Sequence, residues 1–203
     1  MNTTLMREIL FYLFFSLRFL SFAQTTDKGY WSSQAELEIS IPNKLEYYYG
    51  VPLPDRGIGK ESYGKTIMLE RKPMWGANYS INYEWFEKFR IGALGGFTYM
   101  SYPSMVVSKL GGVLRYDATE ELNMDFFVSL AVHFPLNKDT TIDLSEGKIG
   151  INFPVFKRKK YSIYLTSHLT LTFFRRLTPI FSTNENPGDV EFRGAGIGVG
   201  VCF

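Results

Sequence analysis

The sequence contains a single cysteine, Cys202, among its 203 residues, so no disulfide can form within one chain. An excess of charge of one sign is also missing, because 22 Lys and Arg residues balance 20 Asp and Glu residues and the formal net charge is +2. A surface that binds nucleic acid needs a basic excess on one face. The balance therefore argues against nucleic acid as a partner, and the chain must be held together by its own packing or by a membrane.

Long apolar runs are absent beyond the N-terminal region. A membrane-spanning helix needs about 20 apolar residues, and only the stretch around residues 9–22 comes close. This run follows Arg7 and ends in the small-residue pattern Ser21-Phe22-Ala23, which is typical of a secretory signal peptide. Arg18 interrupts the run, and a charge at the bilayer centre costs at least about 2.5 kcal/mol, which argues against a membrane anchor. We therefore expect a signal peptide over residues 1–23, cleavage after Ala23, and a mature chain of residues 24–203.

Aromatic residues and glycine are abundant instead: aromatic residues make up 17% of the chain, and 18 residues are glycine. This combination favours a β-rich protein with many turns. Apolar and polar residues alternate with period two in eight stretches, which is the signal of half-buried β-strands. These stretches are residues 31–41, 75–85, 89–101, 105–117, 125–134, 148–155, 161–173 and 194–203.

The lengths of the predicted strands and of their connections point to a membrane. Seven of the eight stretches have 10 to 13 residues, about twice the length of usual soluble strands, which matches a tilted strand that crosses a bilayer. Short connections such as residues 118–123 and 157–160 mostly alternate with long ones such as 42–73 and 175–189. This asymmetry is expected when short turns face the periplasm and long loops face outward, so we expect one long outer loop over residues 42–73.

A soluble β-sandwich would also show alternation, but two features favour a barrel. Large aromatic residues lie near both ends of the apolar faces, where they suit the two membrane interfaces. They are Trp31, Trp85, Phe89, Tyr116, Phe126, Phe153 and Tyr161 at one end and Trp75, Tyr99, Phe134 and Phe173 at the other. The polar faces are rich in Gly, Ser, Thr and Asn, which fit a narrow interior. We predict an all-β fold, an eight-stranded antiparallel transmembrane β-barrel with up-and-down meander topology.

The last predicted strand ends on the aromatic residue Phe203. With a signal peptide and eight alternating strands before it, the chain resembles the small eight-stranded β-barrels of Gram-negative outer membranes. The resemblance implies contact with outer-membrane lipid and recognition by the barrel assembly machinery of an alternating C-terminal signal, here Ile197, Val199, Val201 and Phe203. One departure is the connection around Pro103, which is shorter than an outward loop usually is and leaves the register of strands 89–101 and 105–117 open.

Charged residues of both signs fall on the faces that would point into the barrel. They are Glu36, Glu38, Glu84 and Asp125 together with Arg90, Lys109, Arg115 and Lys148. An isolated buried charge is costly, so we expect these side chains to pair and to fill the interior; a charged pathway or proton relay is the alternative. A barrel of eight strands has room for side chains but hardly for a water-filled channel, which argues against a general porin.

The two histidines, His133 and His168, also point inward by this alternation. A general base would need a nucleophile beside it, and although Ser129, Thr166 and Thr170 share the inward faces, they form no recognisable catalytic constellation. We therefore expect interior hydrogen bonding for both histidines, and we assign no catalytic, cofactor-binding or metal-binding residue.

The expected outer loop contains Tyr47, Tyr48 and Tyr49, a residue type that suits recognition of a protein or ligand partner, or aromatic packing within the loop itself. The sequence favours a monomeric, non-enzymatic membrane scaffold or recognition protein that acts through its outer loops. An accessory barrel of an envelope transport or secretion system, and a lipid-modifying outer-membrane enzyme, are the alternatives.

Overall fold

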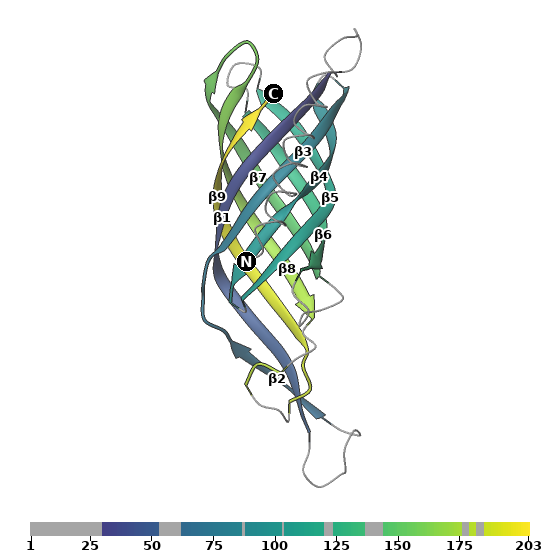
Figure 1. Cartoon of the computed structure of the whole chain (residues 1–203), viewed down its shortest axis with the longest axis vertical. Coiled ribbons are helices and arrows are strands. Elements are labelled where there is room, and N and C mark those ends of the chain that lie inside the picture. The colour runs from purple at the N-terminus through teal and green to yellow at the C-terminus, as the bar shows by residue number, and fades with distance from the viewer. Residues whose placement is uncertain are drawn as a thin grey trace, which may run out of the picture.

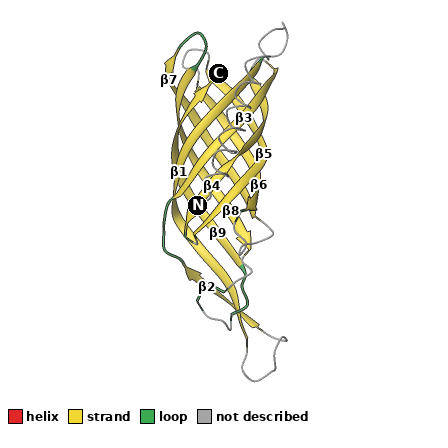
Figure 2. Cartoon of the chain, viewed as in Figure 1, coloured by secondary structure: helices red, strands yellow, loops and turns green. Residues whose placement is uncertain are grey.

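A computed structural model describes residues 30–52, 62–86, 88–102, 104–119, 124–136, 144–175, 179–181 and 185–203. Strands dominate this part of the chain (Figure 2). No helix in it is long and apolar enough to cross a bilayer. The predicted signal peptide and its cleavage site lie outside these residues.

The described residues form nine strands. They are β1 (Trp31–Pro52), β2 (Ser62–Met68), β3 (Met74–Phe86), β4 (Phe89–Ser101), β5 (Ser104–Thr119), β6 (Met124–Pro135), β7 (Leu144–Lys157), β8 (Ser162–Arg175) and β9 (Asp189–Cys202). All except β2 belong to one ring in which each strand pairs antiparallel with its neighbours.

The ring closes where β9 pairs with β1 (Figure 1). At the seam, the N–H groups of Phe203 and Ser33 each donate to the other residue's carbonyl oxygen, over 2.8 and 3.2 Å. The pairing of β4 with β5 runs without a shift from Phe89 and Tyr116 to Ser101 and Ser104, so only two residues connect the strands. The predicted eight-stranded antiparallel meander is confirmed, and β2 is an additional strand outside the ring.

The described residues of the predicted outer loop over residues 42–73 are largely β-structure. β1 continues to Pro52 and pairs with β2 on one side and with the start of β9 on the other. A β-bulge between Pro42 and Lys44 shifts the alternation by one residue, which is why the sequence pattern is lost at that point. We call residues 42–52, β2 and residues 189–193 the outer extension. It projects from the ring at the end opposite to the C-terminus (Figure 1).

We call the end of the ring that holds Trp31 and Phe203 the inner end, and the other the outer end. Side chains around the ring alternate between an apolar outside and a polar inside, as β6 illustrates. Leu130 is 68% exposed on the outside, whereas His133, three residues further on, is 2% exposed inside. The arrangement is the reverse of a soluble protein, in which apolar side chains fill the interior.

Candidate functional site in the barrel interior and the outer extension

The interior changes character along β1. Before the bulge, β1 presents Glu36, Glu38 and Ser40 to an interior rich in polar groups; after the bulge it presents Leu45 and Tyr47 to an apolar cluster. The interior therefore has a polar zone towards the inner end and an apolar zone towards the outer end.

Asp125 on β6 is the centre of a first group of charges, near the inner end. Its carboxylate accepts hydrogen bonds from Arg90 at 3.1 Å, from Arg115 at 3.4 Å and from the Asn152 amide at 2.8 Å. Arg90 also binds Asp117, and the Arg115 guanidinium lies 5.4 Å from the ring centroid of Phe127. Two cations and two anions from three neighbouring strands thus neutralise one another.

Four side chains from β1, β5 and β7 form a second group deeper inside. The Lys109 ammonium lies 3.3 Å from Glu38 and 3.1 Å from Glu146, and the Lys148 ammonium contacts the same two carboxylates, Glu146 at 3.1 Å. All four side chains are less than 5% exposed. We call them the central quartet; its charges balance, and it fills the middle of the lumen.

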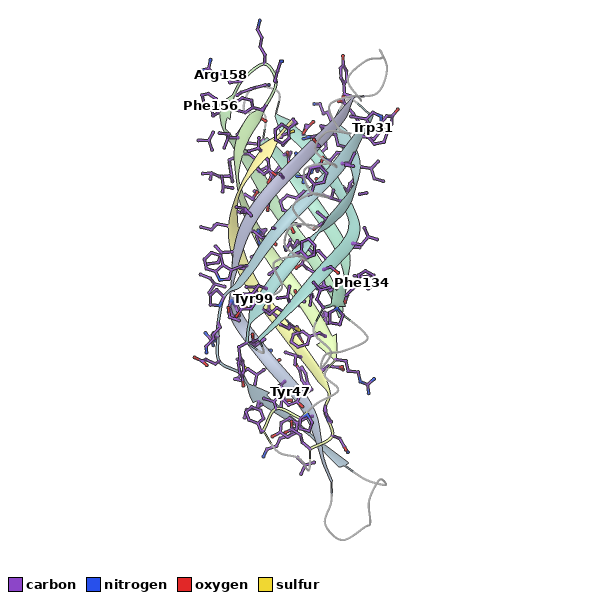
Figure 3. All side chains as sticks on the ribbon, viewed as in Figure 1. Trp31, Tyr47, Tyr99, Phe134, Phe156 and Arg158 are labelled. Atoms are coloured by element: carbon purple, nitrogen blue, oxygen red, sulfur yellow. The ribbon has the colours of Figure 1, made fainter. Side chains whose placement is uncertain are left out.

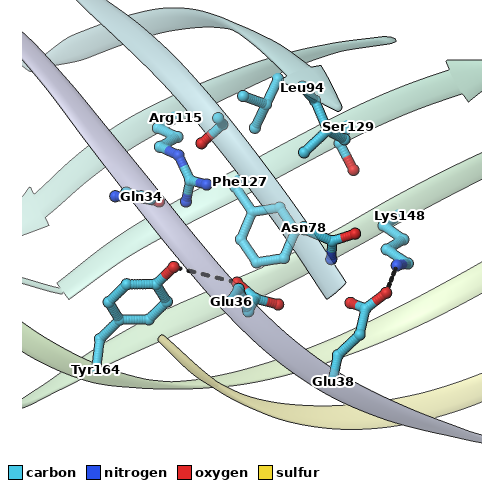
Figure 4. Close-up of a pocket in the computed structure, with 12 residues that line it drawn as sticks. Gln34, Glu36, Glu38, Asn78, Leu94, Arg115, Phe127, Ser129, Lys148 and Tyr164 are labelled. Atoms are coloured by element: carbon cyan, nitrogen blue, oxygen red, sulfur yellow. Dashed lines mark hydrogen bonds and ion pairs between the residues drawn. The ribbon is translucent and has the colours of Figure 1, made fainter. Parts of the chain in front are cut away.

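Glu36 lies between the two groups and has no ion pair with a described cation. Its carboxylate accepts hydrogen bonds from Tyr164 at 3.3 Å and from Thr166 at 3.2 Å, beside a cavity of about 30 Å³ (Figure 4). A space of that size holds one or two water molecules. Glu84, also predicted in the network, is half-buried near the inner end and pairs with no described cation.

Two charged residues of these groups do not belong to the network predicted from the sequence. Glu146 completes the central quartet, and Asp117 holds Arg90. Glu146 has the same parity as Lys148, so extending the predicted strand two residues towards its start would have found it. Asp117 lies two residues after Arg115 on β5, so its side chain is on the same, inward face.

The ligand atoms of Glu36, Glu38 and His168 lie within 4.8 Å of one another, which is the spacing of a possible metal site. Two lysine ammonium groups already contact Glu38, however. A divalent cation there would meet their positive charge, so the arrangement fits an ion-pair network better than a metal centre.

Both histidines are buried in the polar zone. His168 Nε2 lies 2.9 Å from Ser40 Oγ and 3.9 Å from a Glu38 oxygen. A catalytic triad needs the acid on the other ring nitrogen, and His168 Nδ1 has no partner among the described residues. His133 Nε2 lies 3.7 Å from a Glu146 oxygen, and neither ring nitrogen of His133 has a hydrogen-bond partner among the described residues. The described part of the chain therefore holds no Ser-His-acid triad.

The apolar zone closes the lumen towards the outer end. Its fully or almost fully buried members are Leu45, Tyr47, Leu69, Met74, Met100, Met105, Val107, Phe174, Val190 and Phe192. They come from β1, β3, β4, β5, β8 and β9 and from the link after β2. The alternation of the sequence predicts a polar interior throughout; the bulge in β1 and the methionines on inward positions change it at this end.

Tyr47 belongs to this zone and is not exposed, so the prediction that it is available for recognition is wrong. The bulge turns its side chain inward, where its hydroxyl donates to Glu185 at 3.0 Å and its ring stacks on Tyr49 at 5.1 Å. Glu185 also accepts from the N–H groups of Ile180 and Phe181. Tyr49 is half-buried, and of the three tyrosines only Tyr48, 38% exposed, faces outward.

We expect the Tyr48 hydroxyl to stay protonated up to a higher pH than an ordinary tyrosine. Its hydroxyl donates to Glu46 at 2.5 Å, and this hydrogen bond to a carboxylate raises the pKa of Tyr48 to about 12 from the ordinary 10.0. Glu46→Gln removes the negative charge and should lower this pKa. Ultraviolet titration of tyrosinate, with Tyr48→Phe to identify the signal, measures the shift; an unchanged midpoint in Glu46→Gln would contradict the assignment.

At the inner end the lumen opens into a cavity of about 410 Å³ lined by residues such as Glu84, Arg90, Asp117 and Tyr164. The Asp125 group forms part of the wall of this cavity, the central quartet lies deeper inside, and the apolar zone lies towards the outer end. Among the described residues, the opening is thus a vestibule and not the mouth of a continuous channel.

Aromatic side chains surround the outside of the ring near both ends. They are Trp31, Phe89, Tyr116, Phe126, Phe153 and Tyr161 towards the inner end and Trp75, Tyr99, Phe134 and Phe173 towards the outer end, all 37–54% exposed. Figure 3 shows Trp31 at the inner end, Tyr47 in the outer extension, and Tyr99 and Phe134 between them along the long axis of the barrel. A closed ring, an apolar outside between two aromatic belts and a filled polar interior define a transmembrane β-barrel, of the small kind found in outer membranes.

Two solved structures with a similar outline are outer membrane proteins. One is AlkL, determined by solid-state NMR in DMPC bilayers, with 11% identity and a TM-score of 0.43 over 89% of this chain and 93% of AlkL. The other is the crystal structure of OprG from Pseudomonas aeruginosa, with 10% identity and a TM-score of 0.43 over 85% of this chain and 95% of OprG. No protein-family model matches the sequence, and no curated protein sequence matches it.

Proposed function

We propose that the protein is a non-enzymatic outer-membrane scaffold or recognition protein that binds a partner through its outer extension. A closed lumen supports this proposal. Among the described residues, the central quartet and the apolar zone fill the lumen with buried side chains, and no triad for lipid hydrolysis is present. What is left for function is the surface beyond the membrane.

The observation that carries the proposal is the apolar surface on the outer extension. Tyr48 and Met68 share one face of the extension and are 38% and 48% exposed, whereas Ile67 shares the face of Tyr47 and is 37% exposed. Phe181, whose ring contacts Tyr47 and Tyr49 from outside the extension, is 53% exposed. All four lie beyond the aromatic belt that includes Tyr99. Exposed apolar groups within the belts are covered by lipid, but those on the extension are not. Apolar patches outside a membrane are typical of interaction sites, and strands hold such a patch more rigidly than a loop would.

The same proposal includes the orientation and the assembly of the chain. The signal peptide over residues 1–23 would be cleaved after Ala23, and the inner end would face the periplasm. Ile197 and Val199 lie on the lipid-facing outside, 65% and 48% exposed, and Phe203 is 47% exposed at the seam. This placement is compatible with recognition of these residues and Val201 by the barrel assembly machinery during assembly of a monomer.

Photo-crosslinking in living cells tests the recognition role. A photoreactive amino acid in place of Ile67 should give one dominant adduct with an envelope component, because this side chain lies on the exposed hairpin. The matched control replaces Leu130, which is exposed between the aromatic belts and should react with lipid only. Equal products at the two positions would contradict the proposal, and an adduct with a transport or secretion component would favour the accessory-barrel alternative.

A further inference from the structure

The turn between β7 and β8 carries four consecutive basic residues, Lys157, Arg158, Lys159 and Lys160, which we call the basic turn. The turn is tight, since Lys157 pairs with Ser162 and the Arg158 N–H donates to the Tyr161 carbonyl at 2.8 Å. All four basic residues are exposed. No described carboxylate forms an ion pair with Arg158, Lys159 or Lys160, so among the described residues these three positive charges have no counter-charge.

The basic turn lies directly beside the aromatic belt of the inner end. A β-bulge between Pro154 and Phe156 places both Val155 and Phe156 on the outside, 61% and 41% exposed. The Phe156 and Tyr161 rings lie 6.2 Å apart across the hairpin. Figure 3 shows Phe156 and Arg158 together at the end of the ring that holds Trp31.

One contact fixes the direction of the charge. The Arg158 guanidinium carbon lies 5.1 Å from the centroid of the Phe156 ring, in a cation–π contact. Because Phe156 faces the lipid side, this contact keeps the guanidinium at the membrane interface instead of directing it away from the barrel. A soluble partner would be met more readily by charges that project away from the membrane.

We propose that the basic turn is a binding site for the headgroups of anionic phospholipids in the adjacent leaflet, with Arg158 and the neighbouring lysines contacting the phosphate. Guanidinium groups bind phosphate oxygens in bidentate fashion, and lysines beside an interfacial aromatic belt are attracted to an anionic surface. The connection between β3 and β4, at the same end of the ring, reads Glu87-Lys88 and offers no comparable charge. The proposal rests on the membrane placement proposed above, and it adds the class of lipid and the site.

Lipid selectivity of the reconstituted barrel tests this site. The full chain is folded into phosphatidylcholine vesicles that contain spin-labelled phosphatidylglycerol or spin-labelled phosphatidylcholine, and electron paramagnetic resonance gives the relative association constant. We expect a preference for phosphatidylglycerol of about fivefold, the factor that one basic side chain contributes near an anionic surface. The triple variant Arg158→Gln/Lys159→Gln/Lys160→Gln should reduce it to near one, and added salt should weaken it.

The matched control removes the same charge from the other end of the molecule, as Lys65→Gln/Arg71→Gln/Lys72→Gln, and should keep the preference. An equal loss in both triple variants would show general electrostatics and overturn the site. A wild-type barrel that shows no preference for phosphatidylglycerol would also overturn the site. So would a measurement of peptidoglycan binding in which the basic-turn variant alone loses binding. Heat-modifiable migration on a gel reports the folded barrel. It therefore distinguishes a barrel that folds but shows no lipid preference from one that fails to insert into the membrane.

Discussion

The variant Lys148→Met is expected to lower the free energy of unfolding of the barrel by about 3–5 kcal/mol. The Lys148 side chain is 4% exposed, and its ammonium contacts both Glu38 and Glu146. Methionine has a similar volume, so packing changes little, but two buried carboxylates are then left with the single cation Lys109. Urea unfolding in lipid vesicles, followed by tryptophan fluorescence, measures the loss.

A charge-balanced double variant is the control for this prediction. Lys148→Met/Glu146→Gln removes one cation and one anion, so Lys109 and Glu38 remain as a neutral pair at 3.3 Å. It should be more stable than the single variant, because paired residues in one network are not additive. A loss below about 1 kcal/mol in Lys148→Met, the size expected of a surface ion pair, would contradict a buried network.

A valine in place of Gly196 is expected to destabilise the barrel by about 3 kcal/mol, the upper end of the usual cost of overpacking, or to prevent folding. A Cβ at this position would lie 2.3 Å from His168 Nε2 and 2.6 Å from the Ile39 carbonyl oxygen. The backbone of β9 cannot move away, because it pairs with β1 and β8 on both sides. The fraction of heat-modifiable protein and the urea midpoint measure the effect.

The matched control for this second prediction is Gly112→Val. Gly112 is exposed on the outside of β5, and the nearest atom to a Cβ there is the Gly92 carbonyl oxygen at 3.7 Å, an ordinary contact. It should change stability by no more than about 0.5 kcal/mol. If valine is tolerated equally at both positions, the close approach of His168 to β9 is not a constraint.

A double variant tests the same contact even where Gly196→Val fails to fold. Gly196→Ala combined with His168→Ala should lower the free energy of unfolding by less than the sum of the two single changes.

The glycines of β9 illustrate how much of the interior was visible in the sequence. The pattern showed that Gly194, Gly196, Gly198 and Gly200 share one face, but not why they are glycines. The structure supplies the reason, since side chains of other residues lie over each position. A Cβ at Gly200 would meet the Tyr164 ring at 2.3 Å, and one at Gly198 would meet Glu36 at 3.1 Å.

The outer extension shows where the sequence pattern failed. Alternation of period two identifies a strand only while the phase is constant, and the bulge after Pro42 changes the phase. Residues 45–52 therefore looked irregular although they continue β1. The same change of phase decided which tyrosines are buried, so Tyr47 could not be placed correctly from local pattern alone.

The sequence by itself determined the all-β class, the eight strands of the ring and the division into an apolar outside and a polar inside, because the side chains of a strand alternate between two faces whatever its neighbours are. Only the tertiary structure decided which charges meet. Lys109, Glu38 and Lys148 lie on β5, β1 and β7, three strands that are not neighbours in the ring, and their side chains reach one another only across the closed lumen. Ring closure and the phase of each bulge depend on contacts between distant residues, and these created the central quartet, the apolar zone and the projecting outer extension.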